Sequence, residues 1–244
     1  MKKFFITGVS DGLGKRLCND LLLRGHIVYG ISRQECKIDD EIDKRYNLNF
    51  IWKYCDVTKP EDIYNVIAHQ QSIGFLPDIV ILNAGAHLNQ RKDFVFTDCQ
   101  KLFQSNCEGA LRWVDAFIPA FKGRGHGHFV YISSYSAIFA APFSFSYSAS
   151  KRYTSFVLDC LRKQYSRDNI DFTNIYLGLL DTKMSAHLDV PLFLKYPIKK
   201  ATRKIIKCIS NRKKNYCLPV RSLLLHLILA LAPDRVLLKL MSDK

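Results

Sequence analysis

The chain lacks the cysteine spacings that typify a disulfide framework or a metal site. It has eight cysteines but no C-x-x-C pair, and several lie in apolar runs, as Cys55 does in FIWKYCDV. Buried thiols of this kind are typical of a reducing compartment. We therefore expect free cysteines, no metal site and a cytoplasmic location.

The N-terminus also lacks the long apolar region and cleavage site of a signal peptide, because glycines begin at Gly8. The uncharged stretch SLLLHLILALA, residues 222–232, is too short to cross a bilayer. The chain has no solenoid repeat and no low-complexity linker. With 244 residues, 48% of them hydrophobic, we expect one domain over residues 1–244. Residues 185–244 would be a variable substrate loop followed by a basic and apolar helical region.

Acidic residues are absent from Val190 to Pro233, and the net charge of the chain is +14. In this span Ile198, Ala201, Ile205 and Ile209 recur at helical spacing, with basic residues on the other side. The pattern fits peripheral contact with an anionic membrane surface. It also fits a solvated helix face followed by a helix packed on the sheet or on a partner subunit. Nucleic acid is not an expected partner, because no aromatic residues interleave with the basic ones.

What is present is an alternation of short apolar runs and longer amphipathic ones. The predicted strands are Lys3–Thr7, Ile27–Ile31, Phe50–Cys55, Asp78–Leu82, His128–Ser133 and Asp171–Leu177. The predicted helices are Gly12–Arg24, Pro60–Ser72 with Thr58 as its cap, Asp98–Phe121 and Tyr147–Arg167. Strands separated by helices predict an α/β fold with a doubly wound, mostly parallel sheet and helices on both faces. Ligands bind such sheets at the carboxyl ends of the strands.

A glycine-rich turn follows the first predicted strand. Glycines between a strand and a helix allow a phosphate to approach the backbone N–H groups at the helix N-terminus. A glycine-rich turn without a ligand is the alternative. The candidate dinucleotide-binding residues of this turn are Gly8, Ser10, Asp11, Gly12, Leu13 and Gly14.

The second predicted strand ends without the acidic residue that favours NAD. Ser32 and Arg33 stand there instead, and a hydroxyl with a guanidinium suits a 2′-phosphate. We therefore expect NADP(H) to be favoured over NAD(H), although Arg33 could be only a solvated loop charge. After the third strand, Asp56 and Val57 could flank the adenine, or Asp56 could be a turn residue.

Two Tyr-x-x-x-Lys pairs occur, Tyr147 with Lys151 and Tyr196 with Lys200. On a helix this spacing places both side chains on one face. A neighbouring cation favours the phenolate, and lowering a phenol pKa from about 10 to about 7 requires about 4 kcal/mol. A unit charge at about 4 Å supplies roughly that much at an effective dielectric of about 20. The first pair could therefore act as a general acid or base.

The surroundings select the first pair over the second. Ser134 follows the fifth predicted strand, thirteen residues before Tyr147, whereas Lys183 stands thirteen residues before Tyr196. Pro197 also interrupts any helix that begins at Tyr196. After the fourth strand, small residues would admit a cofactor ribose and an amide could bind backbone groups. That segment is Asn83, Ala84 and Gly85.

Taken together, these residues resemble the short-chain dehydrogenase/reductase family. The match runs in order through Thr7-x-x-x-Gly12-x-Gly14, Asp56, Asn83-Ala84-Gly85, Asn106, Ser134, Tyr147-x-x-x-Lys151 and Thr182. It covers about residues 3–184, and the chain length resembles the short single-domain branch. The resemblance implies a Rossmann fold, a nicotinamide dinucleotide cofactor and a homo-oligomer, either a dimer or a tetramer.

The resemblance also implies roles for individual residues. Tyr147 would protonate the oxygen of a small-molecule carbonyl substrate as hydride arrives, and Ser134 would hydrogen-bond the same oxygen. Lys151 would lower the pKa of Tyr147 and bind the nicotinamide ribose, while Asn106 would support a water-linked proton relay. Thr182 would contact the nicotinamide amide.

Two departures from the family pattern stand out. Leu177-Gly178 replaces the frequent Pro-Gly after the sixth strand, and Asp11 stands where many NADP-dependent members carry a basic residue.

The substrate pocket is expected in apolar loops above the nicotinamide, although the same residues could be ordinary core. The candidates are Phe139, Phe143, Phe145, Met184, Leu188, Leu192, Phe193 and Tyr196. They favour a hydrophobic ketone or aldehyde, with a sugar or polyol left open. The competing hypothesis for the whole chain is a catalytically silent cofactor-binding protein that acts as a regulator or membrane-surface scaffold.

Overall fold

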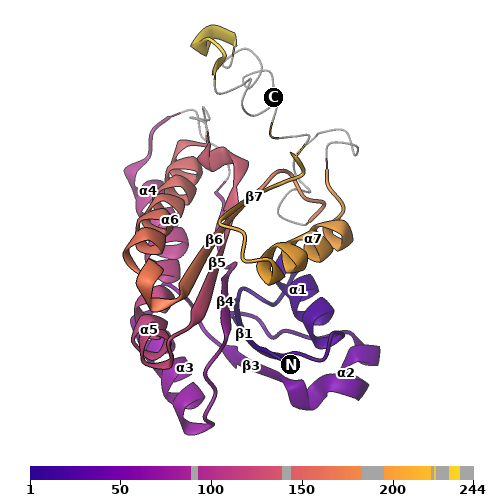
Figure 1. Cartoon of the computed structure of the whole chain (residues 1–244). Coiled ribbons are helices and arrows are strands. Elements are labelled where there is room, and N and C mark those ends of the chain that lie inside the picture. The colour runs from indigo at the N-terminus through magenta and orange to yellow at the C-terminus, as the bar shows by residue number, and fades with distance from the viewer. Residues whose placement is uncertain (89–92, 139–143, 183–194, 221–222, 224–230, 237–244) are drawn as a thin grey trace.

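The computed structural model describes residues 1–88, 93–138, 144–182, 195–220, 223 and 231–236 (Figure 1). The strands are β1 (Lys3–Thr7), β2 (Ile27–Ser32), β3 (Phe50–Tyr54), β4 (Ile79–Leu82), β5 (Gly127–Ser134), β6 (Ile170–Leu177) and β7 (Asn215–Leu218). The α-helices are α1 (Gly12–Leu22), α2 (Asp40–Tyr46), α3 (Pro60–Ser72), α4 (Phe96–Phe103), α5 (Gly109–Arg124), α6 (Phe145–Gln164) and α7 (Ile198–Ser210). The predicted α/β alternation is confirmed.

The described strands form one parallel sheet in the order β3-β2-β1-β4-β5-β6-β7. The chain fills one half of the sheet from β1 to β3 and then crosses to β4 to fill the other half. The strand order therefore reverses between β1 and β4. A crevice outside the carboxyl ends of these two strands is where doubly wound sheets bind ligands.

Helices cover both faces of this sheet, as predicted. Figure 1 shows α1, α2 and α7 on one face and α3, α4, α5 and α6 on the other. Each face has its own apolar core because successive side chains of a strand point to opposite faces of the sheet. On β1, Ile6 packs on the side of α1 and α7, and its neighbour Phe5 packs on the side of Trp113 in α5. Such two-sided burial explains why the strands are continuous apolar runs.

Several local predictions differ from the structure. The helix at Pro60 begins as predicted, but its N-cap is Lys59 and no side chain caps it. Thr58 is not the cap, because its hydroxyl and its backbone N–H both donate to the Asp56 carboxylate. The predicted helix Asp98–Phe121 is observed as α4 and α5, joined by a π-helical turn over Gln104–Glu108.

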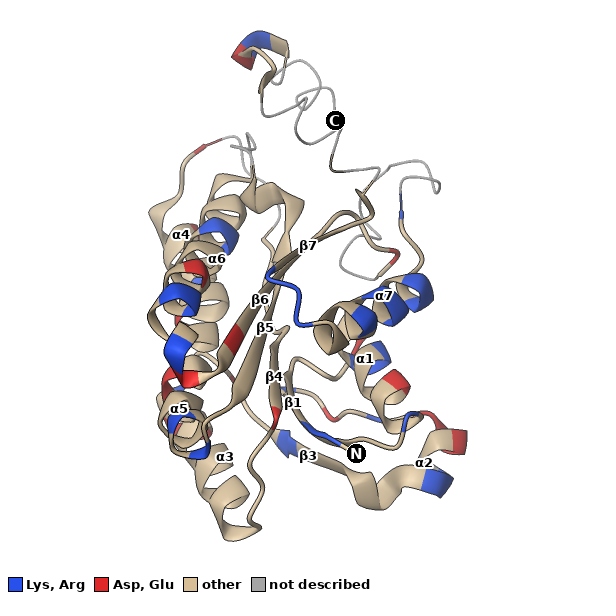
Figure 2. Cartoon of the chain, viewed as in Figure 1, with Lys and Arg blue, Asp and Glu red and all other residues tan. Residues whose placement is uncertain are grey.

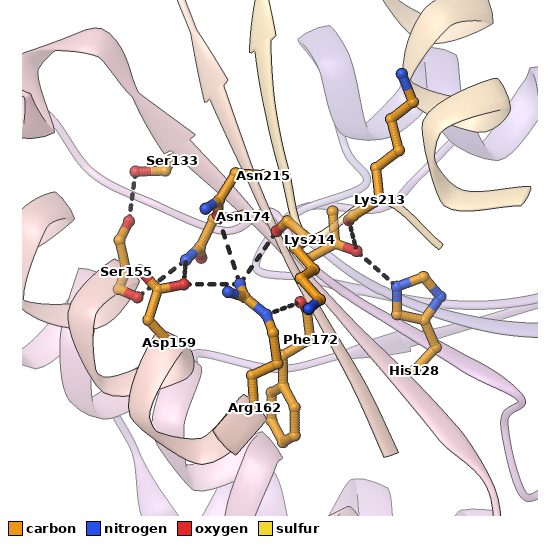
Figure 3. Close-up of polar contacts among 11 residues, drawn as sticks. His128, Ser133, Ser155, Asp159, Arg162, Phe172, Asn174, Lys213, Lys214 and Asn215 are labelled. Carbon is orange, nitrogen blue, oxygen red and sulfur yellow. Dashed lines mark hydrogen bonds and ion pairs between the residues drawn. The ribbon is translucent and has the colours of Figure 1, made fainter. Parts of the chain in front are cut away.

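Helix α2 and strand β7 were not predicted. Strand β7 pairs with β6, and Figure 3 shows the polar contacts that tie its start to α6. Arg162 on α6 forms an ion pair with Asp159 at 2.7 Å and donates to the carbonyl oxygens of Phe172 and Lys214. The bond to Lys214 joins residues 52 apart in the sequence, so a local pattern cannot reveal it.

The basic segment forms α7, with its apolar positions turned inward. Ala201, Ile205 and Ile209 are buried, and α7 packs against α1, where Thr202 donates to Asp20. Figure 2 shows lysines and arginines along the outer side of α7. Residues 222 and 224–230 of the apolar stretch that follows lie outside the described residues. None of the described helices has the length and apolar character needed to cross a membrane.

Candidate active site

The turn after β1 is built so that its backbone bends sharply. Gly8 has φ +75° and Gly12 has φ +57°, a left-handed region that glycine enters without steric cost. At Gly14 a Cβ atom would lie 2.0 Å from the Gly8 carbonyl oxygen and 2.6 Å from the Asn83 Nδ2 atom, so only glycine fits. Asp11 caps α1, since its carboxylate accepts from the Gly12 N–H at 2.8 Å.

The end of β4 is locked onto this turn. Asn83 donates through Nδ2 to the carbonyl oxygens of Thr7 at 2.9 Å and Gly8 at 3.0 Å. The Thr7 hydroxyl in turn accepts from the backbone N–H groups of Asn83 and Ala84. The predicted binding of backbone groups by Asn83 is thus present, and its partner is the glycine turn itself.

The residues predicted near the adenosine end have different surroundings. Ser32 is buried, and its hydroxyl donates to the Gln34 carbonyl oxygen and accepts from Trp52 Nε1. Arg33 is exposed. Burial acts to raise the pKa of Asp56, but hydrogen bonds from Thr58 and the nearby charges of Arg33 and Lys59 outweigh it and lower that pKa. The charge of Arg33 therefore acts on Asp56, while Ser32 is engaged within the protein.

Val57 has a packing role in the structure. A Cβ atom added to Gly109, the first residue of α5, would lie 2.9 Å from Val57 Cγ2. This close approach fixes the distance between the end of β3 and α5.

Tyr147 lies in the first turn of α6, next to Ser134 at the end of β5. The Ser134 side chain interacts with the Tyr147 hydroxyl and acts to lower the pKa of Tyr147. The Ser134 hydroxyl also accepts from the Ser136 N–H at 3.1 Å, and this holds it in place. The ring of His87, from the segment after β4, meets the Tyr147 ring edge-on with centroids 5.0 Å apart. His87 was not predicted, because a lone histidine after Asn83-Ala84-Gly85 carries no pattern of its own.

Lys151 follows Tyr147 by one helical turn and is buried, with 4% of its surface exposed. Its ammonium group donates to the Ile132 carbonyl oxygen at 2.9 Å. It lies 4.8 Å from the ring centroid of Tyr131 and 5.9 Å from that of Tyr147. The exposed backbone of Gly85 is adjacent, since a Cβ atom there would be 3.2 Å from Lys151 Nζ.

Asn106 lies in the π-helical turn between α4 and α5 and is fully buried. Its amide exchanges hydrogen bonds with the backbone N–H and carbonyl of Ala86, at 2.7 and 3.0 Å. It also donates to the Ser150 hydroxyl. Insertions of a π turn are frequent at functional sites because they re-aim one side chain. Here the turn aims Asn106 at the segment that carries Gly85.

The expected direction of the Tyr147 pKa is not found in the structure. Burial raises the pKa of Tyr147 above its ordinary value, and the interaction with the Ser134 side chain opposes this only in part. Burial also lowers the pKa of Lys151 to about 8. The physical reason is that the same dense packing that brings the two groups together removes water from both, which disfavours phenolate and ammonium alike.

The remaining predictions concern residues at the rim of the site. The Thr182 methyl group lies beside the glycine turn, 4.0 Å from where a Gly12 Cβ atom would stand. Phe145 stacks on Phe94 with centroids 5.5 Å apart, and Tyr196 packs partly buried against the core with α7. The other pocket candidates, Phe139, Phe143, Met184, Leu188, Leu192 and Phe193, lie outside the described residues. Within the described part of the chain, His, Cys, Asp and Glu form no group that could hold a metal ion.

A glycine-rich turn at the β1–β4 switch point, together with a serine, a tyrosine and a buried lysine that follow it along the sheet edge, is typical of dinucleotide-dependent oxidoreductases. The model of the short chain dehydrogenase family matches residues 2–190, well over half of the chain. An uncharacterized oxidoreductase of Staphylococcus aureus is 27% identical over 183 residues, which cover 74% of this chain and 79% of that protein. The very-long-chain 3-oxoacyl-CoA reductase of Bos taurus is 25% identical over 226 residues, covering 89% of this chain and 72% of the bovine protein.

A solved structure shares the fold. The short chain dehydrogenase of Burkholderia cenocepacia, crystallised with NADP, superposes with a TM-score of 0.81 at 21% identity, covering 98% of this chain and 97% of that one. The chain belongs to the short-chain dehydrogenase/reductase family. It is an NAD(P)-dependent oxidoreductase that acts on alcohol or carbonyl groups of small molecules.

Proposed function

We propose that this enzyme is an NADP(H)-dependent carbonyl reductase or alcohol dehydrogenase in which Tyr147 is the general acid and base. The observation that carries the proposal is that the Ser134 side chain acts on the Tyr147 hydroxyl, while the buried Lys151 ammonium group, one helical turn on, lies 5.9 Å from the centroid of the Tyr147 ring. A substrate oxygen at this point would meet a proton donor and a second hydrogen-bond donor at once.

The residues after β1 and β4 fit a dinucleotide. Gly12 and Gly85 present bare backbone where a side chain would fill the space beside Thr182 and Lys151. Backbone amides at the N-terminus of α1 suit a pyrophosphate. The bound nicotinamide would supply the hydride. The residues proposed to hold the cofactor are Gly8, Ser10, Asp11, Gly12, Leu13, Gly14, Arg33, Asp56, Val57, Asn83, Ala84, Gly85, Tyr147, Lys151 and Thr182.

Each of these side chains would then have a separate role in the reduction of the carbonyl. Tyr147 donates its phenolic proton to the substrate oxygen, and the raised pKa of Tyr147 keeps that proton in place at neutral pH. Ser134 donates a hydrogen bond to the same oxygen and orients it. The Lys151 cation stabilises the phenolate that remains on Tyr147. The side chain of Asn106 holds the segment that carries Gly85, while the backbone of Asn106 serves the proposed proton relay.

The substrate we propose is a carbonyl on an apolar chain. This is supported by the apolar residues expected in the surrounding loops and by the name of the bovine relative, a reductase of 3-oxoacyl-CoA. The test is NADPH oxidation, measured at 340 nm, against aldehydes, ketones, 3-oxoacyl esters and keto-sugars. We expect turnover with apolar carbonyls. NADPH binding without oxidation by any compound would instead favour the scaffold hypothesis.

Arg33 is the residue on which the NADP preference depends, because Ser32 is engaged with Trp52 and Gln34. Arg33→Met should raise the KM for NADPH by about 10–100-fold, as expected for one charge-assisted hydrogen bond, and leave that for NADH unchanged. Steady-state kinetics with both cofactors measure this. Arg24→Met, an exposed arginine beyond the far end of α1, is the matched control. Equal effects on both cofactors would contradict a 2′-phosphate contact.

We also propose a homo-oligomer that forms through α4 and α6. Phe103 on α4 contacts Tyr153 on α6, and both rings are exposed together with Phe156, which is 69% exposed. Exposed apolar patches of this kind often mark interfaces. Phe156→Lys should convert a dimer or tetramer to a smaller species, as measured by light scattering. A monomeric wild-type protein would refute this interface.

The packing of α7 weakens the scaffold hypothesis, which assumed that this helix binds a membrane surface. An amphipathic helix binds a membrane through its apolar side. In α7 that side is buried against α1, so only its basic side is available to an anionic surface.

A further inference from the structure

Lys151 is a buried cation that has no carboxylate beside it. Among the described residues no ion pair joins it to Asp or Glu, and the group that acts electrostatically on it is the Cys107 thiol. Burying an ammonium group without a partner is costly, and buried lysines usually lose their proton for that reason. Some other group in the structure must therefore favour the charged form.

Two groups from β5 face the ammonium. The Ile132 carbonyl oxygen accepts one of its hydrogen bonds. The ring of Tyr131, which is fully buried, presents its π system with its centroid 4.8 Å away. The Tyr147 ring is farther, at 5.9 Å. Attraction between a cation and an aromatic face is strongest where water is excluded.

We propose that Tyr131 is a positioning residue whose ring holds Lys151 as a buried cation beneath Tyr147. The ring belongs to β5, whereas Lys151 and Tyr147 belong to α6. It acts on the reaction only through Lys151, so its effect on turnover rests on the function proposed above. The effect of the Tyr131 ring on the charge of Lys151 does not depend on that proposed function.

The other titratable groups facing Lys151 would remain neutral near pH 8. Burial raises the pKa of the Cys107 thiol in the π-helical turn. It also raises the pKa of Tyr131 on β5 and of Tyr147 on α6. Lys151, whose pKa burial lowers to about 8, loses its charge as pH rises through that value. Without the aromatic face the charged form is less favoured, so the charge would be lost at a lower pH.

The experiment is a pH titration of the full chain labelled with 13C at lysine Cε and followed by NMR. The Lys151 resonance is assigned by its absence in Lys151→Met. In Tyr131→Leu we expect the Lys151 midpoint to fall by about one pH unit or more. Tyr131→Phe keeps the ring and should keep the midpoint. Phe129→Leu is the matched control, because Phe129 is an equally buried ring two residues earlier on the same face of β5.

An unchanged midpoint in Tyr131→Leu, or an equal fall in Phe129→Leu, would overturn the proposal. If the Tyr131→Leu protein does not fold, the Tyr131→Met variant is used instead, because methionine fills more of the space left by the tyrosine ring. The alkaline limb of the pH profile of kcat/KM should move with the midpoint. A moved midpoint with an unmoved profile would support the role of Tyr131 and refute the catalytic role of Lys151, so the two proposals fail separately.

Discussion

Tyr147→Phe should lower kcat/KM for carbonyl reduction by about 10²–10⁴-fold, the usual contribution of a general acid. The substitution removes one oxygen atom and keeps the ring, so the contacts with His87 and Lys151 persist. NADPH binding should therefore be nearly unchanged. Initial rates of NADPH oxidation and a fluorescence titration of NADPH measure the two quantities independently.

A matched variant separates the loss of the acid from a general effect of removing a tyrosine hydroxyl. Tyr153→Phe makes the same change on the same helix, at a ring that is 46% exposed and makes a tilted contact with the ring of Phe103. It should retain wild-type turnover. Full turnover in Tyr147→Phe would remove Tyr147 from the reaction, whatever the cofactor.

Gly14→Ala should abolish dinucleotide binding and destabilise the fold. The added methyl group would lie 2.0 Å from the Gly8 carbonyl oxygen, a backbone atom that cannot move without shifting the whole turn. Overpacking of this kind typically costs about 1–3 kcal/mol. Thermal unfolding with and without NADPH measures both effects, and we expect a lower Tm that NADPH no longer raises.

Gly123→Ala serves as the control for Gly14→Ala. Gly123 lies within α5, and a Cβ atom there would meet nothing within 4 Å. Alanine should stabilise the helix by about 0.5–1 kcal/mol and leave NADPH binding intact. If Gly14→Ala retained cofactor-dependent stabilisation, the glycine turn would not be the nucleotide site.

The architecture was predictable because both of its periodicities are local. Buried parallel strands such as β1 and β4 are uninterrupted apolar runs, and the helices between them carry amphipathic repeats. Once these alternate, right-handed crossovers bring the strand ends to one edge. That is why Gly8, Asn83 and Ser134 could be predicted to lie at one edge from their positions after strands.

The sequence could not indicate how each side chain would be used. The sequence predicts that Ser32 binds a phosphate, yet Ser32 is buried and its hydroxyl accepts a hydrogen bond from Trp52, which lies on a neighbouring strand. The Tyr147–Lys151 spacing predicts a lowered phenol pKa, yet burial of both groups governs the outcome. Such effects depend on which atoms surround a group, and those atoms come from distant segments.

By itself, the sequence determined the α/β alternation, the glycine turn and the pairing of Tyr147 with Lys151 on one helix, because each depends on residues a few positions apart. Only the tertiary structure decided that β7 pairs with β6, that the apolar side of α7 is core, and that Lys151 lies over the Tyr131 ring. These features arise from contacts between remote segments, where excluded water and close packing set the energies.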